Sequence, residues 1–147
     1  MGLGVYKEVF LGDLDPMTRL LYRYACNEAR RSKCRRRKIG AASYNLDASI
    51  GLGFNSGCDG PCVHEGELPG TNTECNGTHA ERELLDNTPS PPLTLVVTTF
   101  PCLICAERIV QEHVSSVYFR DNYGDNRALG YLLSHGVDVY KIKLREE

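Results

Sequence analysis

The chain has 147 residues, of which 41% are hydrophobic and 24% charged, and these values are typical of a globular domain. Its 17 basic residues nearly balance its 19 acidic ones, so the molecule as a whole has no general electrostatic attraction for nucleic acid. No apolar run approaches the roughly 20 residues of a membrane span, and the N-terminus lacks the features of a signal peptide. We therefore expect one domain over residues 1–147, cytoplasmic and not bound to a membrane.

The first predicted elements are a helix and a β-hairpin. Residues 13–33 carry apolar side chains at helical spacing, with Asp15 as N-cap and Pro16 in the first turn. Residues 39–45 and 49–55 have the composition of two short strands joined by a turn. Residues 56–77 contain two prolines and three cysteines and show no helical or strand periodicity, which indicates a loop. A loop of this length is expected either to have a function or to be held in place by a specific interaction.

From residue 78 onward, predicted helices alternate with predicted strands. The helices cover residues 78–87, 101–113 and 126–136, and the strands cover residues 93–100, 115–121 and 137–144. Strands that are separated by helices are usually parallel neighbours, and helices then cover both faces of their sheet. The pattern predicts an α/β fold with a mixed sheet of five strands.

A metal site is indicated by two cysteines and a histidine. Cys102 and Cys105 stand three residues apart at a predicted helix start, where the partial positive charge favours the zinc-binding thiolate. His79 stands near the start of the preceding helix, so all three side chains converge if both helices begin at one sheet edge. Three protein ligands and an open fourth position are typical of catalytic zinc. The cysteine pair alone is also found in structural zinc sites and redox pairs.

Glu81 allows two interpretations. With Thr78 it has the spacing of a capping box, which only starts a helix. Beside a zinc site it is instead placed to take a proton from water and to pass it to a ring nitrogen and a departing amine. Two thiolates weaken the effect of the metal on its water, so a carboxylate base is needed. We favour the catalytic role.

The chain resembles the cytidine deaminase superfamily, and within it the deoxycytidylate (dCMP) deaminases. The resemblance runs from about residue 15 to 142, through RRSKCRRRKIGAA, GFNSG, THAE, TTFPCLICAERIV, VYFRDNYGD and LLSHGVDV. It implies a three-layer cytidine deaminase-like fold, with catalytic zinc on His79, Cys102 and Cys105 and with Glu81 as the proton shuttle. It also implies substrate contacts from the Asn55 side chain to the sugar, from the Ala80 N–H to the pyrimidine carbonyl, and from Tyr123 and Arg36 on the phosphate side.

The resemblance further implies zinc-dependent hydrolysis of dCMP to dUMP, which supplies thymidylate synthesis. Relatives are often hexamers with dCTP and dTTP as effectors, the effector nucleotide being accompanied by Mg²⁺. Gly124 stands where relatives often have a basic residue, so dCTP is included as an additional substrate. The run HAERELL also departs from the usual family sequence.

A second, structural zinc is implied by the same resemblance. Its ligands are expected among Cys34, Cys62, His64 and Cys75, with Cys58 as an alternative to Cys62. The other interpretation is that these cysteines are free thiols. Cys26 follows helical spacing and is expected to be a buried apolar residue.

The remaining alternatives concern charge and activity. The basic run at residues 30–38 is either a solvated helix end or a phosphate-binding segment, and we favour phosphate binding. A tRNA or other nucleic-acid base deaminase is a competing function, although the sequence ends directly after a strand, without a basic helix. The second competing function is that of a non-catalytic, zinc-stabilised nucleotide-binding regulator, although such a protein would not need Glu81.

Overall fold

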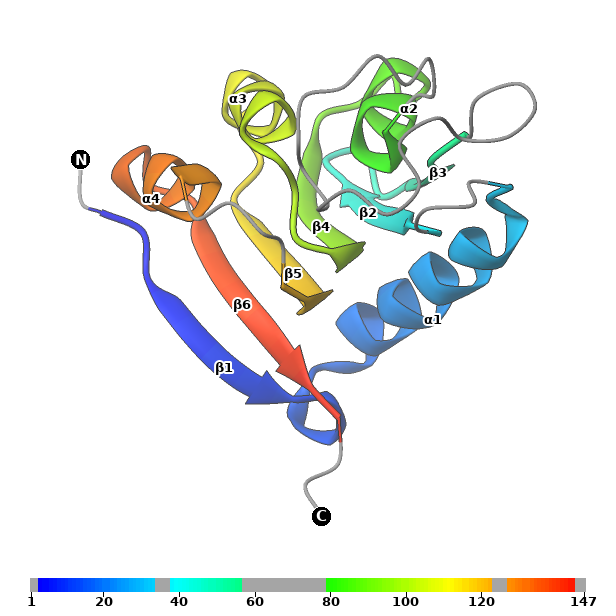
Figure 1. Cartoon of the computed structure of the whole chain (residues 1–147), viewed down its shortest axis with the longest axis horizontal. Helices are drawn as coiled ribbons and strands as arrows, with labels where there is room; N and C mark the ends of the chain where they lie inside the picture. The colour runs from blue at the N-terminus through cyan, green and yellow to red at the C-terminus, as the bar shows by residue number, and fades with distance from the viewer. Residues whose placement is uncertain (1–2, 34–37, 57–78, 123–126, 145–147) are drawn as a thin grey trace.

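The computed structural model describes residues 3–33, 38–56, 79–122 and 127–144. In these residues a mixed sheet of six strands, in the order β1-β6-β5-β4-β2-β3, lies between two layers of helices (Figure 1). The strands are β1 (Tyr6–Phe10), β2 (Gly40–Asn45), β3 (Ile50–Phe54), β4 (Pro92–Thr99), β5 (Ser116–Asp121) and β6 (Asp138–Lys143). The helices are η1 (Leu11–Asp13), α1 (Pro16–Arg31), α2 (Ala80–Asp86), α3 (Leu103–Gln111) and α4 (Arg127–Ser134).

The sheet separates two hydrophobic cores. Helix α1 packs on one face, where Leu21 and Ala25 meet Val96, and helices α2, α3 and α4 cover the other. Neighbouring residues on a strand point to opposite faces, so Val96 and Val97 of β4 belong to different cores. Both valines are fully buried, as expected for a central strand that is covered on both faces. The predicted three-layer α/β fold is confirmed.

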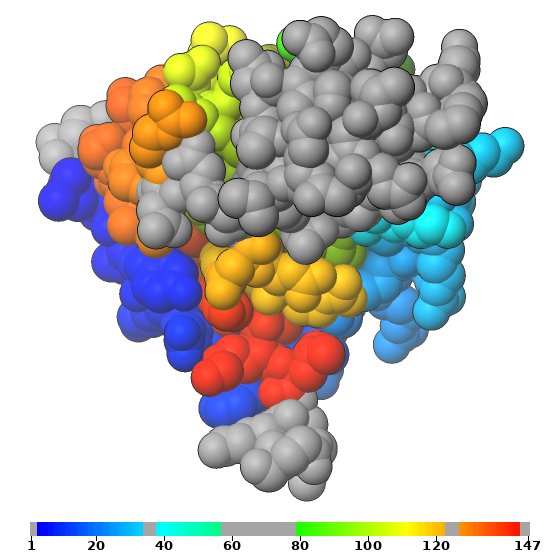
Figure 2. Space-filling view, viewed as in Figure 1, coloured from blue at the N-terminus to red at the C-terminus, as the bar shows by residue number. Residues whose placement is uncertain are grey.

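The strand β1 was not expected from the sequence, which predicted five strands. It pairs in parallel with β6 at the edge of the sheet, and β6, β5 and β4 are parallel to one another. Its segment YKEVF is exposed at every position except Val9, and Figure 2 shows it on the molecular surface. An edge strand with so little burial carries no alternation of apolar and polar residues, which is why the pattern was missed.

Two glycines bring helices close to the β2–β3 hairpin. A Cβ atom at Gly40 would lie 1.9 Å from the carbonyl oxygen of Ala25, so α1 touches the start of β2. A Cβ atom at Gly53 would lie 2.6 Å from the Ala80 carbonyl oxygen and 2.8 Å from the Leu84 nitrogen. The backbone of α2 therefore rests directly on β3, and this contact sets the position of the helix start.

The link from β4 to α3 is tied to the end of β5. The Phe100 N–H donates to the carbonyl oxygen of Asp121 at 2.9 Å, and the Phe100 ring meets Phe119 edge-to-face at 4.7 Å. These contacts fix the chain just before Cys102. Within the four described ranges, every helix is too short or too polar to cross a membrane.

Candidate metal centre and active site

His79, Cys102 and Cys105 lie together at the adjacent starts of α2 and α3. The Nδ1 atom of His79 is 3.5 Å from the Cys102 sulfur and 3.3 Å from the Cys105 sulfur. Their ligand atoms all lie within 4.8 Å of one another, and burial increases from the exposed His79 to the buried Cys105. The expected convergence of these side chains is therefore present, while their role as ligands stays a prediction.

The helix ends explain why the cluster forms. His79 is the N-cap of α2, and Cys102 is the N-cap of α3, where its sulfur accepts the Cys105 N–H at 3.5 Å. Helix N-termini leave N–H groups without intrahelical acceptors, and they stabilise negative charge. A thiolate at Cys102 is thus supported by the backbone of its own helix.

The donor set fits a tetrahedral zinc ion. Zinc bonds of about 2.3 Å to sulfur and about 2.0–2.1 Å to nitrogen give a nitrogen–sulfur separation of about 3.6 Å at a tetrahedral angle. The observed separations of 3.3 and 3.5 Å are close to this value. Two cysteines and one histidine are also ligand types that zinc prefers.

Hydrogen bonds within the cluster favour a negative charge on Cys102. A hydrogen bond from the Cys105 thiol, with a second from His79, lowers the pKa of Cys102 to about 4. The same bond raises the pKa of Cys105, and the bond to Cys102 raises the pKa of His79. A divalent cation stabilises deprotonated ligands, so both cysteines are expected to be thiolates when metal is bound.

Glu81 is buried beside this cluster, with only 4% of its surface exposed. Burial, reinforced by the negative charge of Cys102, raises the pKa of Glu81 to about 7. Because the N-cap of α2 is His79, Glu81 is the second helical residue and does not have the third position that a capping box requires. A carboxyl group with a pKa near neutrality is suited to accept and return a proton.

Glu83 is a positioning residue that the sequence analysis did not identify. Its Oε1 atom accepts the backbone N–H of Phe54 at 3.0 Å, and this bond ties α2 to the end of β3. Glu83 and Glu81 are both acidic residues of the first turn of α2. The two glutamates stand only two residues apart, and the sequence does not indicate that Glu81 is buried whereas Glu83 contacts a neighbouring strand.

The other predicted substrate contacts are only partly described. The Asn55 Oδ1 atom accepts the Ile39 N–H at 2.8 Å, and this bond orients the carboxamide at the mouth of the hairpin. Ala80 is fully buried at the first position of α2, where the helix has no acceptor for its N–H. Tyr123 and Arg36 lie outside the described residues, as do the proposed second-zinc ligands Cys34, Cys62, His64 and Cys75, with the alternative Cys58.

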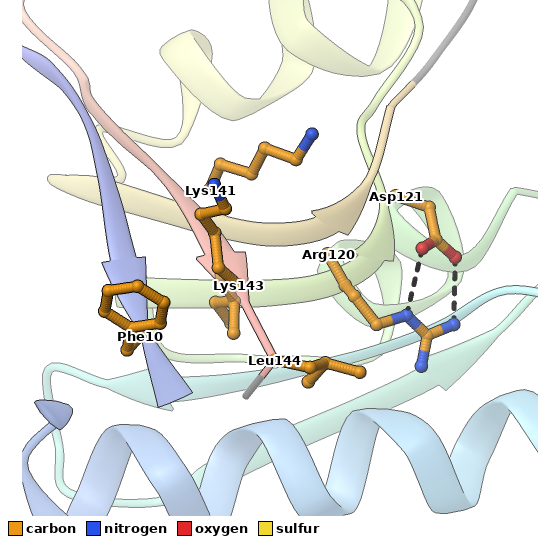
Figure 3. Close-up of a pocket in the computed structure, with 7 residues that line it drawn as sticks. Phe10, Arg120, Asp121, Lys141, Lys143 and Leu144 are labelled. Atoms are coloured by element: carbon orange, nitrogen blue, oxygen red, sulfur yellow. Dashed lines mark hydrogen bonds and ion pairs between the residues drawn. The ribbon is translucent and has the colours of Figure 1, made fainter. Parts of the chain in front are cut away.

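A separate hollow of about 610 Å³ lies at the carboxyl ends of β1, β5 and β6 (Figure 3). It is lined by Phe10, Arg120, Asp121, Lys141, Ile142, Lys143 and Leu144. No member of the cysteine–histidine cluster lines it. It borders the end of β5, to which the segment before Cys102 is bonded.

The chain is similar in sequence to known deoxycytidylate deaminases. Deoxycytidylate deaminase of Saccharomyces cerevisiae is 29% identical over 135 residues, which are 81% of this chain and 42% of the yeast protein. A probable deoxycytidylate deaminase of Caenorhabditis elegans is 34% identical over 119 residues, 76% of this chain and 60% of that protein. The chain thus spans about half the length of these two relatives.

A solved structure shares the fold. It is dCMP deaminase from the cyanophage S-TIM5 in complex with dCMP and dUMP, with a TM-score of 0.69 and 25% sequence identity. The match covers 90% of this chain and 99% of the phage chain. Residues 17–121, which include His79, Cys102 and Cys105, match the sequence model of the family described as "cytidine and deoxycytidylate deaminase zinc-binding region". The chain therefore belongs to the cytidine and deoxycytidylate deaminase family.

Proposed function

We propose that this chain hydrolyses the exocyclic amine of dCMP and releases dUMP and ammonia. The observation that carries the proposal is the buried Glu81 beside the His79, Cys102 and Cys105 cluster. Membership of a zinc-binding deaminase family supports the reaction type. Support for the deoxynucleotide substrate comes from the names of the yeast and nematode relatives and from the dCMP-bound phage protein.

The reaction replaces the amine at C4 of cytosine with oxygen from water. Zinc, when bound by His79, Cys102 and Cys105, makes a water molecule more acidic and more easily converted to a nucleophile. Glu81 takes a proton from this water and donates it to the neighbouring ring nitrogen as the C4–O bond forms. Glu81 then moves the remaining hydroxyl proton to the amine as the C4–N bond breaks, so the carboxylate is regenerated.

Two further residues are proposed to orient the pyrimidine nucleotide. The Ala80 N–H stands at the start of α2, where a helix N-terminus favours an oxygen acceptor such as the C2 carbonyl. The Asn55 carboxamide, which the bond from the Ile39 N–H to its oxygen orients, is proposed to contact the sugar hydroxyl. Tyr123 and Arg36 are proposed on the phosphate side.

The finer parts of the proposal concern supply, regulation and assembly. We propose that the product feeds thymidylate synthesis, that dCTP is a second substrate, and that a structural zinc is held by Cys34, Cys62, His64 and Cys75. We also propose a homo-oligomer, with a hexamer as the expected form, that responds to dCTP or dTTP with Mg²⁺. Similarity to the deoxycytidylate deaminases supports these points except the second substrate, for which the support is Gly124 in place of a basic residue.

The test is a deamination assay on the zinc-loaded chain with dCMP, dCTP, CMP, cytidine and RNA as separate substrates. Loss of cytosine absorbance and chromatographic identification of dUMP are expected with dCMP. A chelator should abolish turnover, and added zinc should restore it. Binding of dCMP without product would overturn the proposal in favour of a nucleotide-binding regulator, and turnover only on RNA would indicate a nucleic-acid deaminase.

A further inference from the structure

We propose that Arg120 is a positioning residue for the metal centre, because it fixes the end of β5 to which the segment carrying Cys102 is bonded. The inference rests on the proposed function in one respect, which is that Cys102 is taken as a zinc ligand. Arg120 itself touches neither the cluster nor Glu81 in any of the described contacts, so it would act only through Asp121.

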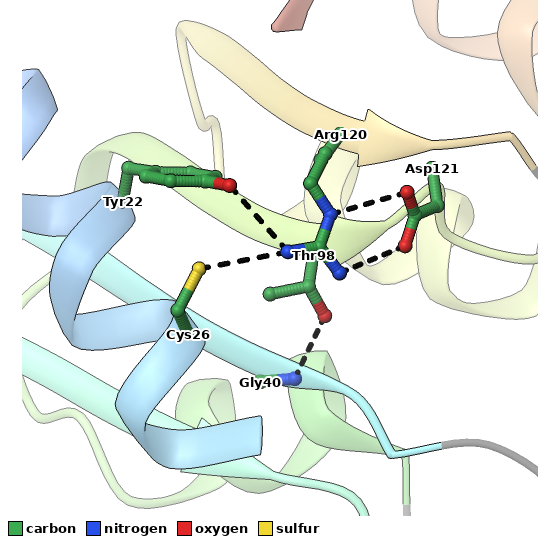
Figure 4. A network of polar contacts seen from close by, with 6 residues as sticks. All are labelled: Tyr22, Cys26, Gly40, Thr98, Arg120 and Asp121. Carbon is green, nitrogen blue, oxygen red and sulfur yellow. Dashed lines mark hydrogen bonds and ion pairs between the residues drawn. The ribbon is translucent and has the colours of Figure 1, made fainter. Parts of the chain in front are cut away.

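The guanidinium of Arg120 holds the neighbouring carboxylate with two hydrogen bonds (Figure 4). Its Nε atom donates to Asp121 Oδ1 at 3.1 Å, and its Nη2 atom donates to Asp121 Oδ2 at 2.9 Å. Its Nη1 atom donates to the Tyr22 hydroxyl at 3.4 Å and approaches the Cys26 sulfur at 3.7 Å. Tyr22 and Cys26 belong to α1, so this one side chain joins the end of β5 to the helix under the sheet.

The free energy of this ion pair is too small to explain it as a stabilising device. The Arg120 side chain is 31% exposed and that of Asp121 is 47% exposed, and exposed pairs contribute roughly 0–1 kcal/mol. The two-bond geometry, in contrast, fixes the direction of the carboxylate as a single bond could not. Position is therefore the main effect of the contact.

Asp121 transmits this position to the metal centre through its backbone. Its carbonyl oxygen accepts the Phe100 N–H at 2.9 Å, directly after the last β4–β5 pair, Thr99 with Asp121. Pro101 has no N–H, so the Phe100 N–H is the last backbone donor before Cys102. A shift of Asp121 would thus reach Cys102 within two residues.

We call the two hydrogen bonds between Arg120 and Asp121 the clamp, and the hollow beside it means that few other contacts could take over its role. Both residues form part of its wall, together with Lys141 and Leu144 (Figure 3). Packed side chains would hold the end of β5 even without the ion pair, but the hollow leaves one side of the pair without such packing. Loss of the guanidinium should therefore increase the motion of Asp121.

The test compares Arg120→Gln with Lys143→Gln by the rate of zinc release to a chromogenic chelator. Lys143 is the control because it lines the same hollow and forms an exposed ion pair with Glu8 at 3.4 Å, which joins β6 to β1 and not to the segment that carries Cys102. We expect Arg120→Gln to release zinc about 10-fold faster or more, as for other residues that orient metal ligands. The Lys143→Gln variant should stay within about twofold of the unchanged chain.

A double-mutant cycle with Asp121→Asn tests the route. If Arg120 acts through Asp121, the double variant should release zinc no faster than the quicker single variant. Equal release from the Arg120 and Lys143 variants, or additive effects in the cycle, would overturn the inference. Because release is measured without substrate, these results are independent of turnover, whereas an unchanged chain that binds no zinc would refute the proposed function itself.

Discussion

At the scale of single residues, Glu81 combines a buried position with a charge that burial disfavours. A carboxyl group with 4% exposure is costly to ionise, and a role in structure alone would be filled equally well by a neutral side chain. Glu81 therefore resembles other active-site carboxyls whose pKa values are displaced toward neutrality. Substitution of Glu81 can therefore distinguish a role in proton transfer from a role in the stability of the fold.

We expect Glu81→Gln to bind zinc normally and to lose deaminase activity by about 10³-fold or more, since proton transfer is removed while shape is kept. The metal-free variant should be at least as stable as the unchanged chain, because a buried ionisable group is replaced by a neutral one. Metal analysis, turnover of dCMP and denaturant unfolding measure the three quantities. A fully active variant would exclude Glu81 as the proton shuttle.

A second residue-scale prediction compares the ends of two helices. Both α3 and α4 end with the same pair of backbone hydrogen bonds, and the left-handed position is His113 (φ 63°) after α3 and Gly136 (φ 82°) after α4. The left-handed conformation is unfavourable for a residue with a Cβ. We expect His113→Gly to stabilise the chain by about 1 kcal/mol in denaturant unfolding. Gly136→Ala is the reciprocal control, and a destabilised His113→Gly variant would contradict the prediction.

At the scale of elements, the start of α1 depends on Asp15. Its carboxylate accepts the Thr18 N–H at 3.1 Å and the Thr18 hydroxyl at 2.6 Å, and the hydroxyl bond lowers the pKa of Asp15. Loss of such a cap costs about 1 kcal/mol, so Asp15→Ala should destabilise the chain at neutral pH.

This stabilisation has a defined pH dependence. A lowered pKa means that the contribution is present above the unfolded pKa of about 3.9 and disappears as pH falls through the folded value. The stability difference between Asp15→Ala and the unchanged chain should therefore shrink below about pH 4. Asp15→Asn keeps a capping oxygen without a titrating group, so its difference should not follow pH in this way. A gap that stays constant down to pH 2 would exclude the carboxylate as the cause.

The second prediction at the scale of elements concerns the close contact between α2 and β3. At Gly53 a Cβ would collide with the backbone of Ala80 and Leu84, whereas at Gly130 in α4 it would meet nothing within 4 Å. Gly53→Ala should displace α2, destabilise the chain by about 1–3 kcal/mol and weaken zinc binding through His79. Gly130→Ala should stabilise the chain by about 0.5–1 kcal/mol, because alanine favours helix. Thermal unfolding and zinc titration of both variants check this contrast, and normal zinc affinity in Gly53→Ala would refute it.

Elements with strong local signals were predictable from the sequence, and those that depend on distant contacts were not. Asp15 and Pro16 set the start of α1 as expected, and the run of β-branched residues in β4 identified a buried strand. The edge strand β1 was missed because it is stabilised by pairing with β6, which is more than 130 residues away. The cluster was predictable because helix starts after parallel strands meet at one edge, whereas the clamp on Asp121 depends on contacts with α1.

At the scale of the whole molecule, the metal centre joins segments that the sequence separates. His79 follows the hairpin, whereas Cys102 and Cys105 follow the central strand β4. Bound zinc would therefore link α2 to α3, which lie on the same face of the sheet. Among described residues the two helices share few direct contacts apart from the Arg108–Asp86 pair at their far ends. The metal should therefore contribute a large part of the stability of this layer.

The expected result is a strong dependence of global unfolding on zinc. A ligand that binds only the folded chain adds about 4 kcal/mol when its free concentration is 1,000 times its dissociation constant. Cys105→Ser should lose one zinc per chain together with most of this increment. Ser134→Ala is the control, because Ser134 lies at the end of α4 and its hydroxyl donates to the carbonyl oxygen of Tyr131 in the same helix. Thermal unfolding with zinc and with chelator, together with metal content, measures both effects. If Cys105→Ser kept the full zinc count and stabilisation, the metal would have to be bound elsewhere, and the centre at α2 and α3 would be excluded.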